Sequence, residues 1–455
     1  MANQNILTSA AKVTQIRQAY YSPVAVIQPN LNSPLSSVYC FLAKVDPWPD
    51  ENNPVVPTQT PKDIKKIFKN IFVTKNISSG SISPVIQRVD WTSGVIYDYY
   101  RDDLEMTAQD NNYNNIYNFY VRNKYDQVFK CLWNNNGVAS TYEPYFQPGS
   151  YGTNNIYTGP DGYQWKYIYT IDIGAKVKFM DTNWLPVPVG NYSPNPLLWS
   201  AGTGNIDVVN VLNGGSGYDT ANSPISIVIT GDGTNFTATA NVAGGSIQNI
   251  IVTTPGSNYT YASASIVSSS GSGAILQSPV SPVGGHGADP ISELGCSHVM
   301  YTVEFNGSEG GLIPTDIDYH QVGLIFNPTT TNLSPYTANG SVYSTTTDIV
   351  VSPGFGVYNN DEFIYQGQSA SNTTFSGLVL SFNTSTNVVK VLNTSGTITS
   401  NKTIYGQSSG TARTLLSYNN PNFVLNSGYL AFVENRTGVQ RSSDGIEQFR
   451  FVLGY

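Results

Sequence analysis

Charged residues are scarce in this sequence. Asp, Glu, Lys and Arg together make up 11% of its 455 residues, which is about half the share found in an ordinary soluble domain. The formal net charge is −8, whereas a protein that binds nucleic acid directly needs a basic stripe to displace counterions from the phosphates. The densest basic run, Lys62 to Lys69, fits the solvated face of a helix. We therefore expect no nucleic-acid partner.

Cysteine and long apolar runs are also scarce. The three cysteines, Cys40, Cys131 and Cys296, are widely spaced and form neither a disulfide framework nor a zinc pattern. No apolar stretch of about 18 residues occurs, which predicts that there is no membrane span. The first residues lack the basic and then apolar run of a secretory signal. These absences predict a protein that is made and kept in a reducing cytoplasm.

Uncharged polar residues and tyrosine take the place of charge. Asn, Ser, Thr and Gln can be buried in a wet protein–protein contact without leaving an unpaired charge there. The sequence contains 31 tyrosines, a residue that is enriched in interface cores and is equally at home on the surface of a β-sheet. The composition favours a protein that acts through large contacts with other proteins.

In most of the chain, Gly or Pro separates short runs of β-branched and aromatic residues, a pattern that predicts β-strands. Apolar residues recur at helical spacing between Ile64 and Phe72, and Thr60 and Pro61 suit the start of that helix. A second helix is predicted from about Ser9 to Tyr20. The clearest strand runs from Tyr163 to Ile173, where alternate residues would share one face. The fold class is therefore mainly β with few short helices.

A repeat occupies the middle of the chain. The strand-like run Ile206 to Val211 leads into a glycine-rich turn that ends at Tyr218, and the run Ile247 to Val252 leads into a similar turn that ends at Tyr259. The offset is constant (247 − 206 = 41 and 259 − 218 = 41). Two copies are too few for a solenoid, so we expect the pair to pack into one small β module over residues 205–283.

A second β module is predicted over residues 353–418. The segment Glu362 to Gly367 is echoed by Lys402 to Gly406, with strand-like runs between them. Both modules have the character of insertions into a larger body. The segments around them carry more Trp and Pro before residue 200 and more charge at the C-terminus.

Motifs for chemistry are weak. Gly406, Ser408 and Gly410 match the Gly-x-Ser-x-Gly nucleophile pattern, but that motif needs a strand-to-helix elbow and a histidine later in the chain. The last histidine is His320, and the surroundings predict strand and turn. We expect no nucleophilic serine here.

Metal and acid–base sites are equally poorly supported. Asp316, Asp318 and His320 could share one side of a strand, but no second cluster completes a metal site. His286 lies in a glycine-rich turn, which favours a histidine hydrogen-bonded to the backbone. Acidic residues gather at Asp46–Glu51 and Arg101–Glu105; a pair of carboxylates can hydrolyse glycosides, yet exposed loop acids are the simpler interpretation. We therefore expect no catalytic, cofactor-binding or metal-ligating residues, no small-molecule substrate and no enzymatic activity.

Several segments together resemble one family, the gene-eight baseplate wedge subunit of T-even-like contractile-tailed phages. The resemblance covers about the first 200 residues and the last 35 and depends on the order and spacing of the segments. These are Ser37 to Lys44, Asp46-Pro47-Trp48-Pro49-Asp50-Glu51-Asn52-Asn53, Val85 to Gly94, Tyr125 to Leu132, Asp161 to Tyr169, Gly428 to Arg436 and Gln440 to Gln448.

The resemblance implies an all-β protein of packed sandwiches that forms a homodimer within each wedge and contacts the other wedge subunits. It places the protein in the virion, in the tail baseplate, after assembly in the host cytoplasm. This chain is longer than the T-even form, and the two modules account for much of the excess. The expected fold is a multi-domain β-sandwich body with two inserted small β modules. The domains are the N-terminal body 1–204, the first module 205–283, the continued body 284–352, the second module 353–418 and the completing strands 419–455.

Other classes of function stay open at this point. In a receptor- or glycan-binding tail protein, the Gly-Tyr repeats would form the binding face; a virion-associated hydrolase and a capsid or neck protein are further alternatives. Trp48, Trp91 and Trp165 are candidate dimer anchors, although packing in the core explains each of them more simply.

Overall fold

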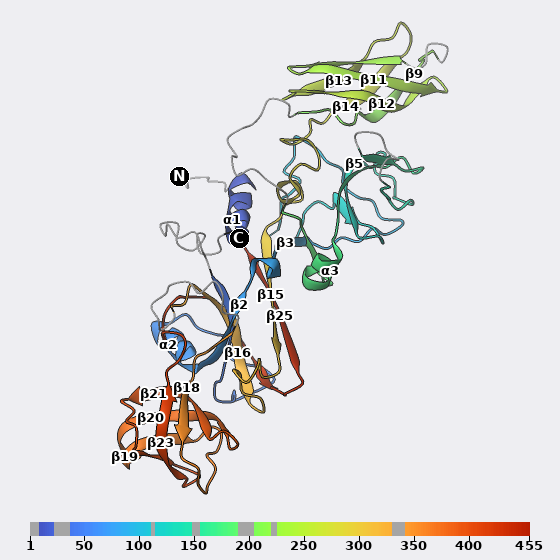
Figure 1. Cartoon of the computed structure of the whole chain (residues 1–455). Helices are drawn as coiled ribbons and strands as arrows, with labels where there is room; N and C mark the ends of the chain where they lie inside the picture. The colour runs from blue at the N-terminus through green and yellow to red at the C-terminus, as the bar shows by residue number, and fades with distance from the viewer. Residues whose placement is uncertain are drawn as a thin grey trace. The chain divides into compact units, whose positions relative to one another are not determined.

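The structure is a computed structural model that describes residues 9–21, 37–110, 114–147, 155–189, 204–219, 225–329 and 342–455. The chain folds into two compact units, each built from separate stretches of sequence (Figure 1). Unit 1 comprises Met1–Arg17, Ser83–Met300 and Val452–Tyr455, and unit 2 comprises Gln18–Ile82 and Tyr301–Phe451. Strands dominate in several sheets and a small barrel, which confirms the prediction of a mainly β, multi-domain fold.

The helices of the described residues are short. They are α1 (Ser9–Tyr21), α2 (Pro61–Asn70), α3 (Ile173–Phe179), α4 (Pro290–Glu293) and the 3-10 turn η1 (Ser79–Ser81). None of the helices in the described ranges is long and apolar enough to cross a membrane.

Both predicted helices are confirmed. Helix α2 begins at Pro61, and the hydroxyl of Thr60 accepts a hydrogen bond from the backbone N–H of Asp63 at 3.2 Å, as an N-cap does. Its apolar face buries Ile67 and Phe68. The helix ends at Asn70, so Ile71 and Phe72, the last two positions of the predicted helical spacing, belong to the strand Ile71–Ile77 instead. Helix α1 covers the residues expected of the second helix.

Unit 2 contains an antiparallel five-stranded sheet. Its order is β17-β2-β1-β16-β24, so strands from the beginning and the end of the chain become neighbours on either side of β16. In β1 all residues are buried, and Phe41 packs with Ile325 and with the apolar face of α2. The strands are β1 (Val38–Ala43), β2 (Ile71–Ile77), β16 (Asp318–Phe326), β17 (Val342–Ser344) and β24 (Tyr429–Gln440).

Unit 1 contains a four-stranded sheet of order β4-β5-β7-β6. The predicted strand is present as β7 over a shorter range than Tyr163 to Ile173, because Ile173 begins α3. Tyr163 and Trp165 lie fully buried with Tyr167 packed against them. The register then shifts, because Val128 pairs with Tyr169 and Phe129 with Tyr167. The strands are β4 (Tyr120–Arg122), β5 (Gln127–Trp133), β6 (Ile156–Thr158) and β7 (Gln164–Thr170).

A further four-stranded sheet has the order β25-β15-β3-β8. The boundaries between the two units fall within α1 and within three of these strands, β3, β15 and β25. The strands are β3 (Ile82–Gln87), β8 (Trp184–Pro186), β15 (His298–Asn306) and β25 (Ile446–Gly454).

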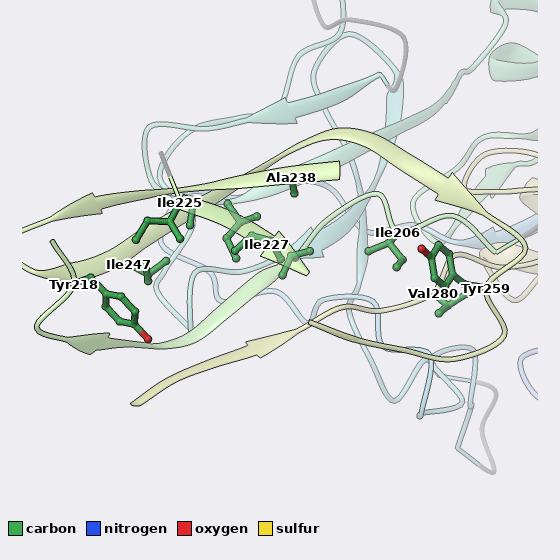
Figure 2. Packing of buried hydrophobic residues seen from close by; sticks show 11 residues of the cluster. Ile206, Tyr218, Ile225, Ile227, Ala238, Ile247, Tyr259 and Val280 are labelled. Carbon is green, nitrogen blue, oxygen red and sulfur yellow. The ribbon is translucent and has the colours of Figure 1, made fainter. Parts of the chain in front are cut away.

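The repeat segment of unit 1 forms a small β module with one apolar core (Figure 2). One sheet has the order β12-β11-β10-β13 and the other pairs β14 with β9. Figure 2 shows Tyr218 and Tyr259 toward opposite ends of the cluster, with Ile225, Ile227 and Ala238 between them. The strands are β9 (Asn210–Ser216), β10 (Ile225–Gly231), β11 (Thr234–Ala243), β12 (Ser246–Ser257), β13 (Ala262–Ile266) and β14 (Ser272–Gln277).

The two repeat units of this module exchange equivalent hydrogen bonds. The backbone N–H of Tyr218 donates to the carbonyl of Gly245 at 3.0 Å, and that of Tyr259 donates to the carbonyl of Gly204 at 3.1 Å. Acceptors and donors are both displaced by the repeat offset (245 − 204 = 41). Each tyrosine thus bonds to the glycine that lies two residues before the apolar run of the other unit, which begins at Ile206 or Ile247.

Unit 2 also contains a closed six-stranded barrel of order β18-β21-β20-β19-β22-β23, drawn in orange and red in Figure 1. Its core includes Ile349, Ile364 and Val389, all fully buried. The first strand, β18, precedes residue 353 and closes the barrel by pairing with β21 and β23. The strands are β18 (Thr347–Val351), β19 (Phe363–Ser369), β20 (Asn372–Asn383), β21 (Val388–Gly396), β22 (Thr403–Gly406) and β23 (Ala412–Asn419).

Candidate functional site

The most unusual group of charges in the described residues is buried in unit 1. Lys130, on β5, and Glu293, at the end of α4, have side chains that are 1% and 3% exposed, and Lys130 Nζ lies 3.2 Å from Glu293 Oε2. The imidazole of His286 is 2% exposed, with Nδ1 at 3.6 Å from the same carboxylate oxygen. Because a buried charge needs a partner, these three residues have to be considered together.

Local structure positions each member of this cluster. Glu293 Oε1 accepts hydrogen bonds from the backbone N–H groups of Gly287 at 2.7 Å and Asp289 at 3.3 Å, so the carboxylate closes the glycine-rich turn that contains His286. Tyr100 completes the enclosure: Lys130 Nζ lies 4.0 Å from its ring centroid, and the His286 ring meets it edge to face.

The environment changes the acidity of all three groups. Burial lowers the pKa of Lys130, and the neighbouring carboxylate of Glu293 opposes that shift. Burial works against ionisation of Glu293, but Lys130, His286 and the backbone N–H of Asp289 outweigh it and lower the pKa. Burial, followed by the charge of Lys130, lowers the pKa of His286 to about 4. The imidazole is therefore neutral at pH 7, and the cluster ties the turn to β5.

Sequence reasoning anticipated only one residue of this cluster. His286 was expected to hydrogen-bond to the backbone, whereas its Nδ1 faces the carboxylate of Glu293. Lys130 and Glu293 were missed because 163 residues separate them in the sequence. The available signal was a single lysine inside the apolar run Val128 to Leu132.

The candidate trio Asp316, Asp318 and His320, which the sequence left without a second cluster, is held by other contacts in the structure. His320 on β16 lies 3.5 Å from Asp318 and 3.2 Å from Glu51, but Lys44 forms an ion pair with Asp318. Asp316 lies ahead of the strand, with its backbone N–H bonded to the carbonyl of Arg441. In the described part of the chain no three His, Cys, Asp or Glu residues are grouped so as to hold a metal ion.

The Gly-x-Ser-x-Gly segment is a turn between β22 and β23 and has no helix after it. The hydroxyls of Ser408 and Ser409 donate to the carboxylate of Glu362 at 3.0 and 2.8 Å, and their backbone N–H groups donate to it as well. Glu362 is 4% exposed. This arrangement satisfies a buried carboxylate just before β19 and lacks the elbow that the nucleophile motif requires.

The acidic loop segments have structural partners. Glu51 accepts backbone hydrogen bonds from Trp48 at 2.6 Å and from Gly438 at 2.9 Å. Asp102 accepts one from the backbone N–H of Val280, and Asp103 pairs with Arg101. Glu51 thus holds its loop against β24, Asp102 joins its loop to the segment after β14, and Asp103 pairs within its own loop.

The candidate tryptophans and the repeat tyrosines are engaged within the chain. Trp165 is fully buried, Trp48 Nε1 donates to the carbonyl of Arg436, and Trp91 Nε1 donates to the hydroxyl of Ser140. Tyr218 and Tyr259 are only 7% and 6% exposed. In the alternative in which the Gly-Tyr repeats form a binding face, these two rings are not the contact residues, because both pack in the core of the module.

Exposed apolar side chains mark surfaces that the chain itself leaves uncovered. Phe355, in the barrel loop after β18, is 101% exposed, and Val56, before α2, is 81% exposed. On α3, Ile173 and Val177 are one helical turn apart and are 79% and 66% exposed. Single exposed apolar residues are ordinary, but an aromatic tip and an apolar helical pair suit contacts with other proteins.

No known family model matches this chain, and no curated protein does either.

Proposed function

We propose that the chain is a non-enzymatic structural protein of a phage virion, a baseplate wedge subunit of a contractile tail. Its role is to make protein–protein contacts during baseplate assembly, which takes place in the host cytoplasm. The proposed partners are a second copy of the chain and the other wedge subunits.

One observation carries the proposal, the five-stranded sheet of unit 2. The resemblance to wedge subunits lies in the N-terminal part of the chain and at its end. The sheet makes β1 and β2, from the first part, and β24, from the last part, into members of one structure around β16. A wedge subunit with added modules requires such a body, in which a strand from the end of the chain joins the sheet formed by the first strands.

The behaviour of the modules agrees with this proposal. Within the described part of the chain, strands β9 to β14 pair only among themselves, and so do the strands of the barrel. Each module also begins and ends on paired strands, since Asn210 pairs with Gln277 and Asp348 with Asn419. Paired antiparallel residues are about 5 Å apart, so each module can be added to a body without moving the points of attachment.

The surface supports a role in permanent contacts. The sequence has few charges, and charged groups are the ones that lose most when an interface excludes water. The exposed apolar residues on α3 and at the barrel tip provide apolar contact area, as the fully buried cores of such interfaces do.

Size-exclusion chromatography with light scattering tests the proposal. The purified chain is run alone and then mixed with the other tail proteins encoded in the same genome. We expect a stable dimer that enters a larger complex and stays in it at moderate salt. A monomer or trimer that ignores the other tail proteins would contradict the proposal.

A further inference from the structure

A groove of about 1010 Å³ lies within unit 1, where the loops around β5, β6 and β7 face strands β9 and β12. Two hydrogen bonds join its walls: Asn136 Nδ2 donates to the carbonyl of Val211 at 3.0 Å, and Asn210 Nδ2 donates to the carbonyl of Leu132 at 3.4 Å. The volume is at the upper end of the range for ligand pockets, so the groove has room for a chain of several linked units.

The lining excludes anionic ligands. Among the described lining residues there is no Lys or Arg, while Asp161 and Asp207 contribute carboxylates. Phosphates, sulfated polymers and nucleic acids would therefore meet like charge with no cation to pair with. The other polar groups are amides and hydroxyls, including Asn135 on one wall and Asn249 on the other.

Two acceptors in the groove are left without donors. Gln164 Oε1 is buried and has no hydrogen-bond partner. The Asp207 side chain is in a residue only 8% exposed, and no described residue donates a hydrogen bond to it; the charges of Lys130 and Lys166 act on it through space. A buried acceptor without a donor costs about 1–3 kcal/mol. The unpartnered oxygen of Gln164 therefore favours a ligand that brings hydroxyl donors, and the carboxylate of Asp207 can accept from such donors as well.

Asp161 contrasts with these two residues. Its carboxylate already accepts from the backbone N–H groups of Thr141 and Tyr142 and from the hydroxyl of Ser140. It holds a loop in place and has little capacity left for a ligand. The acceptors available for binding are those of Gln164 and Asp207.

We propose that this groove binds a neutral oligosaccharide. Sugar hydroxyls supply the donors that Gln164 and Asp207 lack, and they can donate to and accept from the amides of the two walls. The exposed side chain of Ile251 gives apolar surface for the C–H face of a sugar ring. The proposal is separate from the wedge assignment, because a subunit held in an assembly can still bind a glycan.

The experiment measures binding of defined oligosaccharides to the full-length chain by saturation-transfer NMR and titration calorimetry. The probes are maltohexaose, cellohexaose and N-acetylchitohexaose, with a heparin-derived hexasaccharide as the charged control. We expect saturable binding of at least one neutral probe and no binding of the charged one. Gln164→Met, which keeps the size of the side chain and removes the acceptor, should raise Kd about fivefold.

Two neighbouring residues of β12 provide a matched pair of variants. Thr253 and Thr254 are both exposed, but only Thr253 lines the groove. Thr253→Trp should block binding, whereas Thr254→Trp should leave it unchanged, with thermal melts confirming that both variants are folded. If Thr253→Trp fails to fold, Gln164→Met decides the question.

Three results would overturn the proposal. One is that no neutral probe binds at millimolar concentration, and another is that the heparin hexasaccharide binds more tightly than the neutral probes. The third is binding that responds equally to the Thr253 and Thr254 substitutions, which would place the sugar outside the groove. None of these results changes whether the chain dimerises or joins a wedge complex, so the two proposals fail separately.

Discussion

Removal of either charge of the Lys130–Glu293 pair should lower the free energy of unfolding substantially. Both are almost completely buried and 3.2 Å apart, and removal of one partner from such a pair leaves an uncompensated charge in a place that water cannot reach. We expect Lys130→Met to lower the free energy of unfolding by about 3–5 kcal/mol. Differential scanning calorimetry of the full chain measures the effect.

The control is a double variant. Glu293→Gln removes the second charge while its amide oxygen can still accept from Gly287 and Asp289. Lys130→Met combined with Glu293→Gln should therefore be more stable than Lys130→Met alone. Additive losses would mean that the two charges do not stabilise each other.

His286 gives the same cluster a dependence on pH. Its pKa is lowered to about 4 in the folded chain, whereas an unfolded histidine titrates near pH 6.5. Between these values the unfolded state binds more protons, so the free energy of unfolding decreases as the pH falls from 6.5 to 4. The full loss is about 3 kcal/mol at one pKa unit per about 1.4 kcal/mol. Thermal melts across pH 7 to 4 measure it.

His286→Gln should flatten part of that profile. The remaining slope is expected to include His298, whose pKa burial also lowers to about 4. Glu293, whose pKa is lowered to about 2, stays ionised above pH 5 and contributes little slope there. An unchanged profile in His286→Gln would show that the histidine is solvated in solution.

Between elements, the repeat module offers a comparison inside one molecule. Gly204 and Gly245 are equivalent by the repeat offset, and both have positive φ, +86° and +76°. A Cβ at Gly204 would overlap the backbone oxygen of Tyr259, whereas at Gly245 the nearest atom is 3.5 Å away. Replacement by Ala brings backbone strain of about 1–2 kcal/mol at either position, but a steric clash at only one.

We therefore expect Gly204→Ala to destabilise the chain by about 1–3 kcal/mol more than Gly245→Ala. The two variants are compared by thermal unfolding under identical conditions. Equal shifts in Tm would contradict the close approach of Gly204 to Tyr259.

At the scale of helices and strands, the sequence predicts those features whose signal lies within the element itself. Helix α2 follows from apolar spacing and from Thr60, and β7 follows from aromatic alternation; both signals lie within the elements themselves. The repeat offset was legible too, but the burial of Tyr218 and Tyr259 was not, because it depends on how the two units pack. The pairing of Lys130 with Glu293 and the groove beside β12 arise from contacts between distant segments, and no local pattern encodes them.

For the molecule as a whole, the barrel is expected to be separable from the body. Its strands pair only with one another, and Asp348 pairs with Asn419. Replacing residues 347–419 with a short Gly-Ser linker should leave the rest of the chain folded, at the loss of the contacts that Lys44 and Asn70 make with Asp361 and Asn393. Circular dichroism and light scattering test this, and an aggregated or unfolded product would show that the body needs the barrel.

Closure of this barrel affects how readily copies of the chain associate through the edges of their sheets. An open sheet ends in strands with unpaired backbone groups, at which a second copy can continue the hydrogen-bond ladder. The six strands around Ile349 and Ile364 form a ring with no terminal strand. A protein that is synthesised in many copies can therefore carry this module without gaining a template for polymerisation.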